Sequence, residues 1–346
     1  MIDSREQKII DFIKKIGTCS SKEVHEKANI SASYATVKRV LAKLVFEKYL
    51  ATVGKGKGTK YTLSPTFELL EPVQLDKYFE KEIDEREIKE EYNFSLINKV
   101  IANHSVFTKN ELAKLSALQE KFQKNISQLS EAAYKKEFER LAIDLSWKSS
   151  QIEGNTYSLL ETERLLKERE TAAGKTKEEA VMLLNHKDAL DFILQNPDYL
   201  HPLSVSKIED IHYMLTKELS IERNIRKRRI GISGTNYRPL DNEFQLSEAF
   251  KSACQVINAK ENVFEKALLA LVLISYIQPF MDGNKRTARI VANAVLMNEN
   301  HCPLSFRTVD SIDYKKAMLL FYEQNNISSF KEIFLQQFEF AVNTYF

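Results

Sequence analysis

The residues best suited to chemistry lie together in residues 278–289, which read QPFMDGNKRTAR. The preceding residues 267–276 are almost wholly apolar and predict a buried helix, whereas Pro279 and Gly283 predict a tight loop. Apolar residues recur at helical spacing beyond the loop, so a second helix is expected to begin near Asn284. A loop that leads into a helix N-terminus presents free backbone N–H groups and the positive end of the helix dipole, which favour an anion.

Two arginines and one carboxylate flank this predicted anion site. Arg286 and Arg289 are three residues apart and therefore share one face of the second helix. Two guanidinium groups beside free N–H groups suit a polyphosphate. Asp282 lies at the edge of the loop, where its carboxylate would hold the Mg²⁺ that accompanies phosphates.

The same stretch resembles the signature of the Fic (Fido) family, H-x-F-x-(D/E)-G-N-(G/K)-R-x-x-R. Every defining position except the first is matched, by Phe280, Asp282, Gly283, Asn284, Lys285, Arg286 and Arg289. The first position, which is the catalytic histidine in the family, is Gln278 in this chain. The resemblance implies a mainly α fold, in which an all-helical core carries a small β-hairpin flap.

Members of this family mostly transfer AMP from ATP to a hydroxyl group of a target protein. The resemblance therefore implies ATP and Mg²⁺ as ligands, and Ser, Thr or Tyr hydroxyls of another protein as acceptors. It assigns the anion hole to Gly283, Asn284 and Lys285, with the magnesium ion on the carboxylate at the edge of the loop. It further assigns phosphate oxygens to Arg286 and the γ-phosphate to Arg289.

The glutamine at the histidine position leaves the function open between two classes. A histidine removes the proton of the incoming hydroxyl, but the amide of Gln278 does not titrate near neutral pH. A positioned base contributes about 100- to 10,000-fold in rate, so strong AMP transfer is not expected. One hypothesis is an impaired or repurposed adenylyltransferase, and the other is a nucleotide-sensing, DNA-binding regulator without transferase activity. A kinase of the Doc type is less favoured, because that branch usually carries alanine where Gly283 stands.

A second motif lies far upstream of the anion site. A long helix is expected around residues 130–154, and its end resembles the family's inhibitory motif, (S/T)-x-x-x-E-(G/N). Ser149, Glu153 and Gly154 occupy the matching positions. The resemblance implies that Glu153 pairs with Arg289 and thereby blocks productive nucleotide binding. The alternative is that Glu153 only stands beside a glycine that caps the helix.

Residues 229–239 alternate and turn in a way typical of a small hairpin. Their position matches the family's flap, which aligns an extended target segment by strand addition. The resemblance assigns target binding to Ile230, Gly231 and Ile232, and the alternative is an ordinary surface hairpin. His212, on an amphipathic helix upstream, is interpreted as a core residue rather than a catalytic one.

The N-terminal residues 1–65 are basic, with 13 Lys and Arg against 6 Asp and Glu, a net charge of +7, whereas the whole chain carries +2. Three helical patterns precede two alternating segments around a Gly- and Lys-rich tip at residues 54–58. Residues 5–64 thus resemble a winged helix-turn-helix. A basic head on an acidic remainder predicts that duplex DNA binds at the head. A protein-docking module is the alternative.

The third helical pattern is expected to enter the major groove, and the tip lysines are expected to contact phosphates. The predicted DNA-binding residues are Ser33, Tyr34, Thr36, Arg39, Lys43, Lys55 and Lys57. A P-loop in this Gly-rich tip is rejected, because no Gly-Lys-Ser/Thr follows a glycine at the required spacing.

The chain is predicted to divide into a winged helix-turn-helix at 1–65, an acidic connector at 66–92 and a Fic domain at 93–346. Within the last part, Thr108 and Glu111 predict a capping box. Three scattered cysteines indicate a reduced, cytoplasmic setting without a zinc site. The sequence has neither a signal peptide nor an apolar run of membrane-spanning length, so no membrane partner is expected. It leaves a homodimer open.

Overall fold

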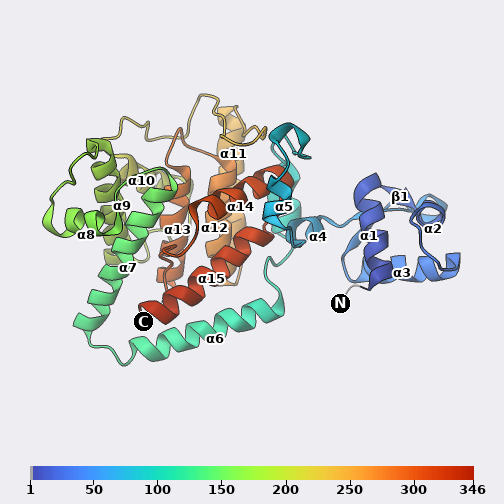
Figure 1. Cartoon of the computed structure of the whole chain (residues 1–346), viewed down its shortest axis with the longest axis horizontal. Helices are drawn as coiled ribbons and strands as arrows, with labels where there is room; N and C mark the ends of the chain where they lie inside the picture. The colour runs from blue at the N-terminus through green and yellow to red at the C-terminus, as the bar shows by residue number, and fades with distance from the viewer. Residues whose placement is uncertain (1–2) are drawn as a thin grey trace. The chain divides into compact units, whose positions relative to one another are not determined.

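The computed structural model describes residues 3–346, with the side chain of Lys57 excepted. The chain forms two compact units, of which the first ends at Pro72 and the second begins at Val73 (Figure 1). The predicted connector at 66–92 is divided between them. The helix α4 (Pro65–Leu70) belongs to the first unit, and residues 73–92 belong to the second.

The first unit contains α1 (Ser4–Ile16), β1 (Cys19–Ser20), α2 (Ser21–Lys27), α3 (Tyr34–Phe46), β2 (Leu50–Val53), η1 (Gly56–Gly58), β3 (Lys60–Leu63) and α4. Side-chain caps define where its helices begin, because Asp3 and Glu6 form a capping box at α1 and Ser20 and Glu23 form another at α2. The strands make an antiparallel sheet of order β1-β3-β2, in which β2, η1 and β3 form the wing. The predicted winged helix-turn-helix is therefore present.

A small apolar core holds the first unit together. One face of α1 and the inner faces of α2 and α3 are fully buried in it. Its central side chains are Ile9, Ile10, Ile13, Val24, Val37, Leu41 and Leu44. The predicted inward faces of the first and third helices supply most of this core.

The second unit is helical. It contains α5 (Leu75–Phe79), η2 (Ile83–Glu85), the π-helical η3 (Leu96–Ile101), α6 (Lys109–Ile126), α7 (Glu131–Ile152), α8 (Leu159–Glu168), α9 (Lys177–Gln195), α10 (Val205–Thr216), α11 (Glu243–Ala259), α12 (Val263–Ile277), α13 (Asn284–Asn298), α14 (Ser311–Gln324) and α15 (Ser328–Thr344). The predicted capping box of Thr108 and Glu111 opens α6. The mainly α fold is as predicted.

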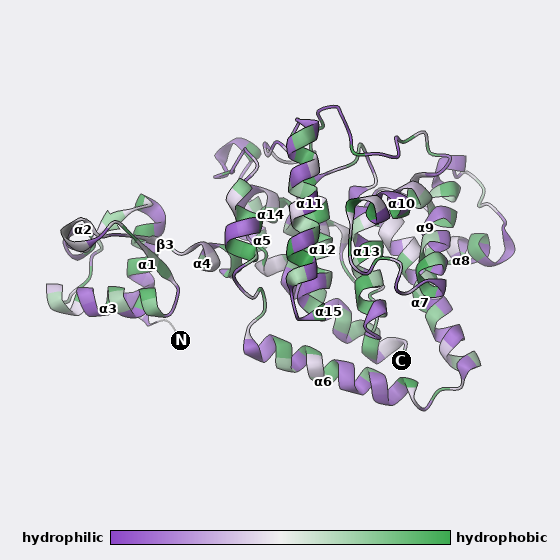
Figure 2. Cartoon of the chain, turned by 180° about the vertical axis from the view of Figure 1, so that it is seen from behind, coloured by the Kyte–Doolittle hydropathy of each residue, from purple (hydrophilic) through white to green (hydrophobic). Residues whose placement is uncertain are grey.

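The buried helix α12 forms the centre of the second unit. Every residue from Ala267 to Ile277 is at most 1% exposed, which confirms the predicted buried helix. Figure 2 colours the helices by hydropathy, and α13 packs along α12. Within the described part of the chain, no helix combines the length and the apolarity of a membrane span.

Candidate functional site

The predicted anion loop joins α12 to α13, and the side chain of Asn284 fixes its shape. Oδ1 of Asn284 accepts from the backbone N–H of Phe280 at 2.9 Å, and its Nδ2 donates to the Phe280 oxygen at 2.8 Å. Gly283 has a φ of 79°, and a Cβ there would lie 3.2 Å from Cγ2 of Thr216. Both the conformation and the close approach favour glycine. The helix α13 begins at Asn284, as predicted.

His212 supports this loop from α10 and is a core residue, as the sequence indicated. Its ring stacks on Phe280 with a centroid separation of 3.8 Å, and its Nε2 lies 2.9 Å from the backbone oxygen of Asp282. Burial lowers the pKa of His212 below its ordinary value, although its Nδ1 also lies 3.2 Å from the backbone oxygen of Arg223. It positions the loop and does not line the cavity described below.

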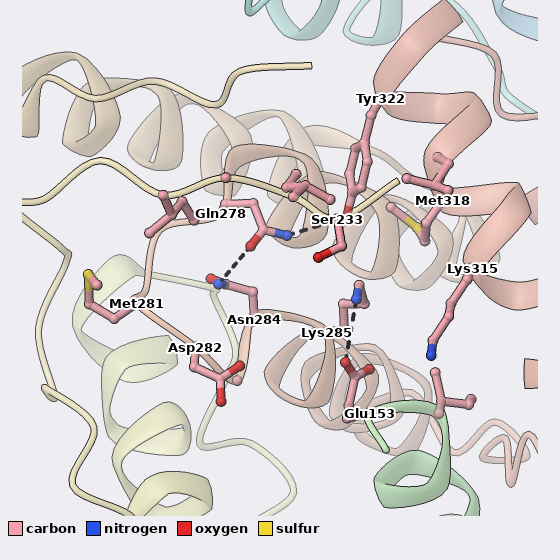
Figure 3. Close-up of a pocket in the computed structure, with 16 residues that line it drawn as sticks. Glu153, Ser233, Gln278, Met281, Asp282, Asn284, Lys285, Lys315, Met318 and Tyr322 are labelled. Carbon is pink, nitrogen blue, oxygen red and sulfur yellow. Dashed lines mark hydrogen bonds and ion pairs between the residues drawn. The ribbon is translucent and has the colours of Figure 1, made fainter. Parts of the chain in front are cut away.

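Gln278 ends α12 in a left-handed conformation, with φ of 52°, and is only 8% exposed. Its Nε2 donates to the backbone oxygen of Ser275 at 2.7 Å and to the Tyr322 hydroxyl at 3.3 Å. Its Oε1 accepts from Nδ2 of Asn284 at 2.9 Å (Figure 3). Both amide N–H groups are therefore used within the protein, and only one lone pair of Oε1 is left for another donor.

The side chain of Arg289 is fully buried and is held by the end of α7. Its Nε donates to Oγ of Ser149 at 2.8 Å, and its Nη2 donates to the Ser149 oxygen at 2.8 Å and to Oε1 of Glu153 at 2.9 Å. The other carboxylate oxygen of Glu153 lies 3.4 Å from Nζ of Lys285. The structure thus brings together the glutamate and the arginine that the resemblance pairs. Ser149 contributes two of the contacts.

The carboxylate of Glu153 is charged in this setting. Burial opposes its ionisation, but the positive charges of Arg289 and Lys285 outweigh burial and hold the pKa of Glu153 below its ordinary value. Gly154 follows with φ of 102°, and the N–H of Asn155 donates to the Ser150 oxygen, which closes α7 in a Schellman motif. The glycine cap and the arginine contact therefore coexist, although the sequence presented them as alternatives.

Arg286 is 1% exposed, and its Nη2 reaches Oδ2 of Asp282 at 3.2 Å. Its Nε and Nη1 have no hydrogen-bond partner among the described residues.

His186 of α9 is also fully buried, and burial together with the charges of Arg289 and Arg286 holds its pKa well below its ordinary value. A neutral His186 adds no charge to the two arginines. The sequence analysis missed it, because a single histidine on a helix carries no distinctive spacing.

A cavity of about 360 Å³ opens beside these groups (Figure 3). Glu153, the loop from Gln278 to Lys285 and residues 230–233 line it on three sides. The helix α14 supplies the remaining wall with Lys315, Met318, Leu319 and Tyr322. The sequence analysis did not foresee this wall, because spacing of three and four residues is that of any packed helix face. Asp282 also borders the cavity, with 69% of its side chain exposed.

The predicted hairpin at 229–239 requires a correction. The chain reverses at Ser233 and Gly234, but its two arms are not paired as strands. The second arm instead contacts the end of the segment 83–91, through the bridge between Arg238 and Glu91. The first arm, with Ile230, Gly231 and Ile232, lines the cavity, and binding of a target segment by these residues stays a prediction.

The predicted DNA-binding residues lie on α3 and the wing of the first unit. Ser33 caps α3 and its hydroxyl also contacts Thr36, while Tyr34, Arg39 and Lys55 are exposed. Lys43 instead reaches Oε1 of Glu6 at 2.5 Å, and this contact raises the pKa of Lys43. Lys43, which was predicted to bind DNA, therefore forms an ion pair between α3 and α1 instead. The side chain of Lys57 lies outside the described residues.

Comparison with known proteins finds two family matches along the chain. Residues 202–296 match the Fic/DOC family, and residues 2–124 match the family described as Penicillinase repressor. The protein adenylyltransferase Fic of Nematostella vectensis is 27% identical over 181 residues, which cover 48% of this chain and 40% of that protein. Protein adenylyltransferase fic-1 of Caenorhabditis elegans is 26% identical over 174 residues, which cover 48% and 34%. The match thus spans less than half of the length of these curated relatives.

Solved structures support the fold of the second unit. Fic-1 from C. elegans superposes with a TM-score of 0.60 at 20% identity, over 68% of this chain and 72% of that chain. A Fic domain containing signaling protein from Bacteroides thetaiotaomicron superposes with a TM-score of 0.56 at 20% identity, over 66% and 94%. The chain therefore carries a Fic/DOC-family domain preceded by a winged helix-turn-helix domain.

Proposed function

We propose that the cavity binds ATP with Mg²⁺ for transfer of AMP to a hydroxyl of a target protein, and that Glu153 holds this activity off. The observation that carries the proposal is the 2.9 Å contact between Glu153 and Arg289 at the wall of the cavity. A carboxylate in this position takes the place of a phosphate oxygen on a buried guanidinium. ATP must displace it in order to place its γ-phosphate on Arg289.

The charges around the loop support a polyphosphate ligand. Arg286 has two buried donors without a described protein partner, and such donors are rare unless a ligand or water uses them. The start of α13 adds backbone N–H groups and the positive end of its dipole. Glu153 is the acidic side chain already bound at this site, and its removal would release Lys285 and one contact of Arg289 for phosphate oxygens, while Ser149 would still hold the guanidinium in place.

Asp282 is the residue that would hold Mg²⁺. Among the described residues, no group of three or more His, Cys, Asp or Glu side chains is arranged to bind a metal. A single exposed carboxylate beside a phosphate site nevertheless fits Mg²⁺, which is often held by one or two carboxylates together with substrate phosphates and water. The ion would neutralise charge on the phosphates of the nucleotide.

The residue at position 278 limits the transfer step. The hydroxyl oxygen of the target attacks the α-phosphorus, the bond to the β-phosphate oxygen breaks, and pyrophosphate leaves with that electron pair. The proton of the hydroxyl needs an acceptor, which a carboxamide does not provide. The remaining lone pair on Oε1 of Gln278 can orient the hydroxyl by accepting its hydrogen bond, so slow transfer is expected from the unmodified chain.

A second candidate function is a nucleotide-sensing regulator that binds DNA. It is favoured by the hydrogen bonds that hold the amide of Gln278 to Ser275, Tyr322 and Asn284, because this arrangement stabilises the loop without any base. The winged helix-turn-helix in the same chain supplies a DNA-binding element. In this candidate, ATP binding would change the affinity for DNA and no AMP would be transferred.

Transfer of labelled AMP in a cell lysate separates the two candidates. Gln278→His alone and Glu153→Gly alone are expected to give little labelling, because each leaves one requirement unmet. Together they are expected to give far more than the sum of the single changes. Gln128→His, an exposed glutamine changed in the Glu153→Gly background, is the matched control. A double variant that binds ATP but labels no protein would reject the transferase and favour the regulator.

A further inference from the structure

The flap comprises residues 229–239, and its second arm is hydrogen-bonded to a segment that lies outside the Fic/DOC match at residues 202–296. This segment, residues 83–91, is called the strap here. Its Glu90 oxygen accepts from the backbone N–H of Arg238 at 2.7 Å, and Glu91 bridges to the same residue. The strap is in turn held on the end of α14, where the Lys89 N–H donates to the Glu323 oxygen at 2.8 Å. The strap therefore connects the flap to the helix that forms one wall of the cavity.

Arg86 is the buried centre of this connection. Its guanidinium lies 3.1 Å from Oε1 of Glu323, and the two side chains are 4% and 0% exposed. Its Nη2 donates to the backbone oxygen of Gly234, at the turn of the flap, at 2.9 Å. The Glu323 carboxylate also interacts with the side chain of Thr235 and accepts from the Tyr78 hydroxyl at 2.7 Å. One ion pair thus holds α14, the strap and the turn of the flap.

The first arm of the flap is held differently. Ile230, Gly231 and Ile232 line the cavity, and no backbone–backbone hydrogen bond from them is present among the described residues. At the turn, Gly234 has φ of 88°, and a Cβ there would lie 3.4 Å from Cδ1 of Leu319 on the cavity wall. The turn therefore rests on α14, while the first arm keeps its backbone groups available for strand addition.

We propose that Arg86 is a positioning residue for the flap: by joining Glu323 to the Gly234 oxygen, it fixes the turn on α14 and so aligns residues 230–232 for the target segment. The alignment of a target rests on the proposed function, whereas the restraint on the flap does not. A lysine at position 86 could keep the ion pair with Glu323. It could not also reach Gly234 in the same geometry, because it has one ammonium group in place of a planar fork.

Hydrogen exchange on the full chain tests the restraint. In the unmodified protein, the amide of Arg238 is expected to exchange at least about tenfold more slowly than those of residues 230–232, because only the former is bonded to the strap. Arg86→Lys and Arg86→Gln are each expected to accelerate exchange of the hydrogen-bonded amides of Tyr237 and Arg238 by at least about tenfold, because a hydrogen bond to a charged group is lost. Arg164→Lys and Arg164→Gln, at an exposed ion-paired arginine of α8, are the matched controls.

Unchanged exchange of the Tyr237 and Arg238 amides in a folded Arg86→Lys variant would overturn the proposal, as would equal protection of Arg238 and of residues 230–232 in the unmodified protein. ATP binding by calorimetry distinguishes the flap from the nucleotide site. Arg86→Lys is expected to leave the affinity of the chain for ATP within about twofold, because Arg86 does not contact the anion loop. A parallel loss of ATP affinity would assign Arg86 to the nucleotide site. A chain that binds no ATP at all would reject the proposed function and leave the exchange result standing.

Discussion

Removal of Glu153 is expected to increase the affinity for ATP, and the size of the increase can be worked out from the contacts of its carboxylate. Its carboxylate makes one charge-assisted hydrogen bond to Arg289 and a longer ion pair with Lys285, and its side chain is only 19% exposed. A hydrogen bond to a charged group contributes about 1.5–3 kcal/mol. Since each 1.4 kcal/mol is a factor of ten, ATP should bind about 10- to 150-fold more tightly to Glu153→Gly than to the unmodified chain.

Calorimetry with ATP and ADP in the presence of Mg²⁺ measures this gain. If Arg289 receives the γ-phosphate, the gain must be larger for ATP than for ADP, which lacks that group. Glu47→Gly is a suitable control, because Glu47 caps α3 with φ and ψ of −78° and 3°, close to the −90° and 6° of Glu153. No gain for ATP, or an equal gain for ATP and ADP, would refute the reasoning.

Three further predictions concern the DNA, pH and stability. Changing Lys55 and Lys57 to Ala should weaken binding of the chain to all duplex sequences alike and reduce the salt dependence measured by fluorescence anisotropy; an unchanged salt slope would contradict contacts from the wing. Because the pKa of Glu153 is lowered, its carboxylate stays charged as the pH falls to about 5. The ratio of the ATP affinity of Glu153→Gly to that of the unmodified chain should therefore stay constant from neutral pH down to about pH 5. Glu6→Ala removes the capping box of α1 and the contact to Lys43, so it should destabilise the first unit by about 1–2 kcal/mol in urea unfolding, and an unchanged midpoint would contradict this role.

The sequence predicted the elements whose determinants are local. The apolar run of α12, the loop glycine at 283 and the capping box of Thr108 and Glu111 each act within a few residues, and each is present in the structure. The contact between Glu153 and Arg289 is not local. It could be predicted only because both residues belong to motifs that resemble one family, and its inhibitory role remains a prediction.

The features that the sequence did not predict depend on distant partners. Residues 229–239 alternate like a hairpin, but the second arm pairs with the strap, which is far away in sequence. The acidic composition of residues 66–92 concealed Arg86, whose buried partner Glu323 lies on α14. Lys43 was predicted to face DNA because its helix position points away from the core, yet Glu6 of α1 lies within its reach.

The position of Glu153 has a consequence for how quickly the site can change state. Glu153 follows the last residue of α7, where the helix dipole presents its negative end, so its own helix disfavours the charge that the arginines attract. The charge of the carboxylate is therefore stabilised by Arg289 and Lys285 and not by the helix that carries it. Glu153 can leave Arg289 through a change confined to the end of α7, while the rest of the helix stays packed. Because opening at a helix end involves few residues, we expect exchange between the closed and open states to be faster than turnover, and the proportion of open molecules to follow the ATP concentration.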